Sequence, residues 1–215
     1  MTPHTANPTN PSKMIRVLGA VSLVCGLMIV ATHVNTLARI RSNQEQIMKE
    51  SVTELLPGME KQIVYGIEPD QSLKILTGVS GEGRRMVAGY DVSGRLLGLV
   101  IEASGRGYAD VISAMYSYSP EKKTVTGFKV VDMKETPGLG NRIGSDEQFG
   151  TNFKQLDATH PITAVKHGTK KNAWEIDAIS GATISSRAVG KMLQQSTAEM
   201  SPIIEKNLAR IQKGE

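Results

Sequence analysis

Residues 177–187 read D-A-I-S-G-A-T-I-S-S-R and place a threonine where chemistry on its hydroxyl is possible. The small residues Ser180, Gly181 and Ala182 allow a sharp turn and let a bulky group approach the backbone. Thr183 then opens a predicted helix, whose free N–H groups and positive dipole end attract an anion. A phosphate group held there would lie beside the threonine hydroxyl.

Two other interpretations of this stretch stay open at this point. Ser180 or Thr183 can simply cap the helix N-terminus, which is the commoner use of such residues. Nucleophilic hydrolysis is disfavoured, because the chain has no G-x-S-x-G sequence and none of its four histidines lies close to the stretch. Distance in sequence does not exclude a histidine that is near in space.

Composition argues against several other kinds of site. The chain is 40% apolar and 21% charged, which is typical of a globular domain. Its net charge is +4, but the basic residues are scattered and no recognition motif accompanies them, so nucleic acid is not an expected partner. Cys25 is the only cysteine and excludes an intrachain disulfide. His160 and His167, with no cysteine nearby, are interpreted as loop residues, and no metal site is expected.

An apolar segment at residues 14–37 predicts a membrane anchor. No charged residue occurs between positions 17 and 34, a helical length that nearly spans a hydrocarbon core of about 30 Å. A cleaved signal peptide is the alternative, but an A-x-A cleavage pattern is absent and the apolar run is too long. The basic residues around the segment are balanced and give no orientation by the positive-inside rule: Lys13 and Arg16 precede it, and Arg39 and Arg41 follow it.

Beyond this segment the patterns predict an α+β domain. Helical spacing of apolar residues continues to Pro57-Gly58, which ends the helix. Ser201-Pro202 is expected to break a C-terminal helix whose apolar face is Ile184, Ala188, Met192 and Leu193. The expected regions are a tail at 1–13, a transmembrane helix at 14–37, a helical connector at 38–58 and a domain at 59–215. Strands are predicted at 62–67, 72–77, 84–91, 95–103, 110–118, 124–133, 162–166 and 174–177.

The sequence D-A-I-S-G-A-T resembles the flavinylation motif D-x-x-[S/T]-G-A-T of membrane-anchored FMN-binding domains. Two further hallmarks of that family are present, E-T-P-G-L-G at 135–140 and G-x-G-Y at 105–108. With the membrane segment, the resemblance covers nearly the whole chain beyond residue 13. It is nearest to the G subunits of Rnf-type electron transport complexes; the C subunits of sodium-translocating NADH:quinone reductases are similar but usually longer. Asp110 departs from the glycine of many members and puts a close backbone approach to the flavin there in doubt.

The resemblance implies that Thr183 carries FMN through a phosphoester bond. A separate FAD-dependent flavin transferase would make this bond, so Thr183 would need no base of its own. Ser180, Gly181 and Ala182 would support the phosphate and the ribityl chain. Asp177, the acid of the motif, would serve the transferase or its metal.

The remaining implied residues would surround the flavin. The alternative for the 135–140 loop is a turn set by its Pro-Gly pair. The alternative for Tyr108 is an ordinary strand-edge aromatic, and that for Lys166 is a solvated surface lysine. In the 135–140 loop, Glu135 and Thr136 would lie near the ring or ribityl chain and Leu139 would pack on the ring, with Gly140 in the same loop. Tyr108 would lie at the border of the flavin. Lys166, on a strand, would be a cation that favours the anionic reduced flavin.

The function implied by the resemblance is that of a one-electron carrier without independent catalytic activity. The subunit would relay electrons among the other redox subunits of an ion-pumping complex that joins ferredoxin and NAD. Its N-terminus would be cytoplasmic and its FMN domain would lie outside the bacterial inner membrane. Two alternatives stay open: an FMN subunit of a sodium-translocating NADH:quinone reductase or other membrane reductase, and a non-redox, membrane-anchored assembly module.

Overall fold

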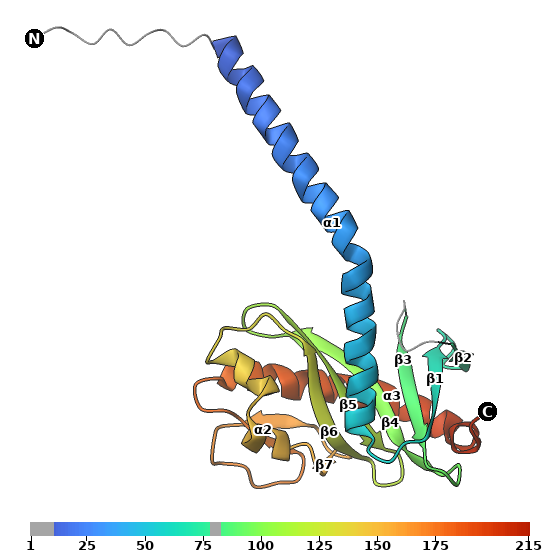
Figure 1. Ribbon diagram of the computed structural model, residues 1–215. Coiled ribbons are helices and arrows are strands. Elements are labelled where there is room, and N and C mark those ends of the chain that lie inside the picture. The colour runs from blue at the N-terminus through green and yellow to red at the C-terminus, as the bar shows by residue number, and fades with distance from the viewer. Residues whose placement is uncertain (1–10, 78–82) are drawn as a thin grey trace, which may run out of the picture. The chain divides into compact units, whose positions relative to one another are not determined.

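The computed structural model describes residues 11–77 and 83–215 and divides into two compact units, Met1–Gln44 and Glu45–Glu215 (Figure 1). The expected polar tail therefore lies mostly outside the described residues. Helix α1 (Pro11–Leu55) contains an 18-residue window of mean hydropathy 2.3, so by length and composition it can cross a membrane. Its predicted end before Pro57-Gly58 is confirmed, and Gly58 has a left-handed φ of 83°.

Within the described residues, seven antiparallel strands form one sheet in the order β2-β1-β3-β4-β5-β6-β7. A parallel pair, β8 and β9, lies after it in sequence. The predicted strands and the α+β class are confirmed. The strands are β1 (Lys61–Ile67), β2 (Leu73–Leu76), β3 (Arg85–Tyr90), β4 (Leu96–Arg106), β5 (Val111–Ser119), β6 (Thr124–Asp132), β7 (Leu156–Asp157), β8 (Thr163–Val165) and β9 (Glu175–Asp177).

Helix α3 (Thr183–Lys213) covers one face of this sheet (Figure 1). The inward side chains of the central strands alternate in sequence and form the larger hydrophobic core beneath the helix. Buried tyrosines tie the sheet to the helix: the Tyr90 hydroxyl donates to the Ile211 carbonyl oxygen at 2.5 Å, and the Tyr116 hydroxyl lies 2.9 Å from Ser196 Oγ. These bonds hold the middle and the C-terminal part of the helix against the sheet.

The last turns of α1, within the unit Glu45–Glu215, pack on the opposite face. Val52 and Leu56 are buried there against valines of β1, β3 and β4. At Gly89 a Cβ atom would lie 2.7 Å from Leu56 Cδ1, so the absence of a side chain lets the helix end approach the strand. The sheet is therefore covered on both faces.

Two expectations for the C-terminal helix are wrong. Ser201-Pro202 does not break it, because Pro202 and the residue four positions earlier, Ala198, are both exposed and water can satisfy the carbonyl that proline leaves unpaired. The neighbouring Ile203 and Ile204 are buried, and each contributes about 1.5–3 kcal/mol, enough together to offset a proline cost of about 3 kcal/mol. Ile184 is 56% exposed and does not belong to the buried face.

Two short helices connect β6 to β7. The 3-10 helix η1 (Gly140–Gly144) begins inside the E-T-P-G-L-G sequence. Helix α2 (Glu147–Thr151) follows it, and the Asp146 side chain caps it by accepting from the Phe149 amide at 2.9 Å. This connection brings the second family motif toward the start of α3.

We predict that Tyr90→Phe lowers the free energy of unfolding by about 1–2 kcal/mol, because the Ile211 carbonyl loses a buried donor. Tyr108→Phe is the matched control, since this side chain is 65% exposed, and it should change stability by less than about 0.5 kcal/mol. Urea denaturation of the full chain in detergent measures both. Equal stabilities of the two variants would show that the Tyr90 contact contributes nothing to anchoring α3.

Candidate functional site

A tight loop leads from β9 into the first residue of α3. Gly181 has φ +84°, a left-handed conformation that side chains rarely adopt. The Ala182 amide donates to the Ile179 carbonyl at 3.0 Å. Ser186 closes the loop from inside the helix, since its Oγ accepts from the Ile179 amide at 3.1 Å and donates to the Ala182 carbonyl at 2.9 Å. The loop and the first turn of α3 thus form one hydrogen-bonded unit.

Thr183 is the first residue of α3 and is half-buried. The N-cap position belongs to Ala182, which makes no side-chain cap bond, so the simple capping interpretation of Ser180 or Thr183 is wrong. Among residues 11–77 and 83–215, the Thr183 hydroxyl has no hydrogen-bond partner. It lies at the positive end of a 31-residue helix, where negative charge is stabilised.

The carboxylate of Glu135 joins the three motifs. Its side chain is only 7% exposed. Oε2 accepts a hydrogen bond from Ser185 Oγ at 2.6 Å, within the first turn of α3. Oε1 accepts from the Ala109 amide at 3.0 Å, in the turn between β4 and β5 that follows G-x-G-Y. Residues far apart in sequence are therefore held around one buried charge.

The Glu135 carboxylate is stabilised in its charged form. Burial by itself raises the pKa, but hydrogen bonds from the Ser185 hydroxyl and from the amides of Ala109, Asp110 and Tyr108 outweigh it and hold the pKa below its ordinary value of 4.5. A buried carboxylate with this many donors is ionised at neutral pH. It therefore acts as a fixed acceptor in this part of the structure.

Two glycines make room for this carboxylate. A Cβ atom at Gly107 would collide with Glu135 Oε1, and one at Gly140 would collide with Glu135 Oε2 and lie 2.7 Å from Ser185 Oγ. Each glycine belongs to one of the quoted motifs. Their presence is therefore explained by close approach of the carboxylate to the backbone, and not by a special backbone angle.

Large apolar side chains remain exposed on the segments that Glu135 holds. Tyr108 is 65% exposed, Leu139 51% and Ile184 56%. Leu139 Cδ2 lies 3.7 Å from the position that a Cβ at Gly181 would take, so this leucine borders the loop before Thr183. The Thr136 carbonyl accepts from the Leu139 amide at 3.2 Å and so holds the turn, while its side chain is exposed.

The motif acid Asp177 lies in the wall of a cavity next to this cluster. Its Oδ1 accepts from the Gly168 amide at 2.7 Å, and its Oδ2 lies 3.6 Å from Nδ1 of His167. The cavity has a volume of about 270 Å³ and also has Ser180, Arg142 and polar and apolar groups of α2 in its wall. Arg142 Nη1 donates to the Ser180 carbonyl at 3.4 Å. The cavity thus adjoins the loop that carries Thr183.

Lys166 is placed less favourably for the role of a flavin-binding cation than the sequence suggested. It is exposed, one residue beyond β8, and its side chain has no hydrogen bond or ion pair with any residue that the structure describes. Sequence reasoning missed Asn152, Arg142 and Lys170, which lie at the cavity in its place. Each occurs in a polar loop or short helix with no local pattern that marks a site.

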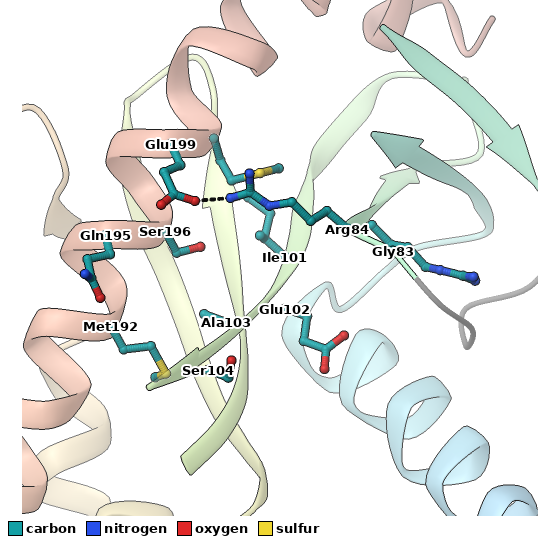
Figure 2. A pocket seen from close by; sticks show the side chains of 12 residues that line it. Gly83, Arg84, Ile101, Glu102, Ala103, Ser104, Met192, Gln195, Ser196 and Glu199 are labelled. Carbon is teal, nitrogen blue, oxygen red and sulfur yellow. Dashed lines mark hydrogen bonds and ion pairs between the residues drawn. The ribbon is translucent and has the colours of Figure 1, made fainter. Parts of the chain in front are cut away.

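Figure 2 shows a larger cavity, of about 330 Å³, between α3 and strands β3 and β4. Arg84 and Glu199 form an ion pair across it, above the buried side chains of Met192 and Ile101. No residue of the three motifs lines this cavity. The size of this cavity alone does not associate it with the chemistry of the motifs. The smaller cavity beside Ser180 is therefore the better candidate for the functional site.

Comparisons with known proteins identify related chains. Residues 107–198 match the family model described as FMN-binding domain. The G subunit of the ion-translocating oxidoreductase complex of Methanosarcina acetivorans is 32% identical over 194 residues, which cover 88% of this chain and 94% of that protein. The G subunit of the Na(+)-translocating ferredoxin:NAD(+) oxidoreductase complex of Acetobacterium woodii is 30% identical over 82% of this chain and 76% of that protein.

Solved structures share the fold. NqrC of Shewanella oneidensis superimposes with a TM-score of 0.57 at 19% identity, over 77% of this chain and 99% of that one. The C subunit of the Na(+)-translocating NADH-quinone reductase from Parabacteroides distasonis gives 0.55, also at 19% identity, over 77% and 96%. The sequence similarity to a relative of nearly the same extent shows that this chain belongs to the family of G subunits of ion-translocating oxidoreductase complexes.

Proposed function

We propose that this chain is an electron-carrier subunit of a membrane-bound, ion-translocating ferredoxin:NAD oxidoreductase and carries FMN in a phosphoester bond to Thr183. The observation that carries the proposal is the Thr183 hydroxyl at the positive end of α3, which has no hydrogen-bond partner among the described residues. The FMN-binding domain match and relatives named as subunits of such complexes support it. The partners would be the other subunits of the complex.

The residues present fit FMN. A phosphoester at Thr183 would place negative charge where the helix dipole favours it. The exposed Leu139, Tyr108 and Ile184 offer apolar surface for a flat aromatic ring, which would lose its contact with water. Bound FMN supplies the capacity to accept and release electrons, and the protein supplies its position and electrostatic environment.

The chain itself would contribute the nucleophilic oxygen when the cofactor is attached. Thr183 Oγ would displace AMP from the FMN phosphorus of FAD; AMP keeps the bridging oxygen, and the hydroxyl proton is released. A separate flavin transferase would provide the base and the FAD site, so Thr183 would need no hydrogen-bonded base of its own. Asp177, at the cavity that Ser180 also lines, would be available to that enzyme.

We further propose that residues 14–37 span the membrane, that 38–58 connect them to the FMN domain at 59–215, and that the domain lies outside the cytoplasm. The apolar composition of α1 supports the membrane segment. A covalent bond is useful outside the cytoplasm, where lost FMN is not readily replaced. Residues 1–13 would remain inside.

Thr183→Ala should abolish covalent flavin while the domain still folds, because only the acceptor oxygen is removed. The measurement is in-gel flavin fluorescence of the denatured full chain, made together with the transferase. Thr163→Ala, at an exposed threonine of β8, is the control and should fluoresce like the unchanged chain. A fluorescent Thr183→Ala band would disprove the attachment site.

Glu135→Gln should lower the free energy of unfolding by about 1.5–3 kcal/mol near neutral pH, because charge-assisted hydrogen bonds are lost. The Glu135 pKa is lower in the folded state than in the unfolded state, so its stabilisation is present above 4.5 and disappears as the pH falls through the folded value. The difference from the unchanged chain should therefore shrink in acid. Urea denaturation across this range tests it, with the exposed Glu121→Gln as control; a difference that stays constant in acid contradicts the assignment.

Fusions after Glu215 should report the side of the membrane on which the domain lies. Alkaline phosphatase fused there should be active, because it folds only after export, and green fluorescent protein exported by the general secretory route should stay dark. The same reporters fused before residue 14 should give the reverse pattern. A bright fusion after Glu215 with inactive phosphatase would place the domain in the cytoplasm.

A further inference from the structure

Asn152 is a buried amide at the wall of the cavity beside Ser180, with only 6% of its surface exposed. Its Nδ2 donates to the carbonyls of Phe149 at 3.0 Å and Asp177 at 3.2 Å. Its Oδ1 accepts from the Asp177 amide at 2.9 Å and from Lys170 Nζ at 3.1 Å. One side chain thus pairs with the backbone of the motif acid and also holds an ammonium group at the same cavity.

Lys170 differs from the other charged groups of this cavity. Arg142 is paired with Asp146 at 2.6 Å, and the Asp177 carboxylate is occupied by the Gly168 amide and approached by His167. Within the part of the chain that the structure describes, Lys170 has no carboxylate partner, and its one hydrogen bond is to the neutral Asn152 amide. It therefore keeps an uncompensated positive charge and free donors at the cavity.

We propose that Lys170, positioned by Asn152, binds negative charge of the FMN attached at Thr183; this inference rests on the proposed function. The cavity adjoins the loop through Ser180, three residues before the attachment point. Two groups of the cofactor carry such charge: the phosphodiester in every redox state, and the flavin ring once it is reduced. Lys170 supplies the cation for the site. Lys166, whose side chain has no hydrogen bond or ion pair with a described residue, does not.

The test compares Lys170→Met with Lys171→Met in the full chain, loaded with FMN by the transferase. Lys171 is the neighbouring exposed lysine, and no contact ties its side chain to Asn152. The measurements are the flavin midpoint potential and the phosphorus-31 chemical shift of the phosphodiester. Lys170→Met should lower the potential if the reduced ring is the bound anion, because its negative form loses a cation. It should move the phosphorus resonance if the phosphodiester is bound.

Two further variants test the positioning role of Asn152. Asn152→Ser should change the same measurement in the same direction as Lys170→Met, and the double variant should show no additional change because both act through one cation. Lys170→Arg, which keeps the charge, should restore most of the original value. Full additivity in the double variant would contradict the role of Asn152.

The inference fails, while the proposed function stands, if Lys170→Met is fully loaded with FMN and both its midpoint potential and its phosphorus shift equal those of the unchanged chain. It also fails if Lys171→Met shifts them equally, since that would show a general charge effect. An unchanged chain that acquires no flavin from the transferase would overturn the proposed function and this inference with it. Loaded protein with a change confined to Lys170→Met and Asn152→Ser supports both.

Discussion

The ionised carboxylate of Glu135 is the constraint on which the site depends. It is buried and accepts hydrogen bonds from the first turn of α3 and from the turn between β4 and β5. Removing such a charge from water is costly unless every acceptor position is filled, so the donors cannot move independently. Gly107 and Gly140 let the backbone close around it. Three short sequences, separated by dozens of residues, become one rigid structure in this way.

The remaining fold fixes the ends of that structure. Tyrosine hydroxyls from the sheet hold the middle and the C-terminal part of helix α3, while Glu135 holds its first turn through Ser185. The opposite face of the sheet is covered by the end of α1. Tyr108 and Leu139 remain exposed to solvent, and Thr183 is half-buried. A site held this rigidly suits a cofactor that exchanges electrons, because little reorganisation accompanies each change of charge.

Much of the fold follows from local patterns, and much of the site does not. Short apolar runs predicted the strands, and the central strands are indeed buried, on both faces of the sheet. The continuous helix through Pro202 could not be predicted, since it depends on which side of the helix faces the sheet. The same holds for Asn152 and Lys170, whose pairing joins α2 to the loop before β9. The sequence motifs identified Glu135 and Thr183, but the inward direction of Glu135 appears only in three dimensions.

The central claim is that the positioned hydroxyl of Thr183 is the point where FMN is attached. Peptide mass spectrometry of the full chain, produced with FAD and the flavin transferase, tests it most directly. The proposed structure predicts one modified peptide, with the mass of FMN less water assigned by fragmentation to Thr183. An unmodified Thr183, or FMN on Ser180 or Ser185 in the same peptide, would contradict it.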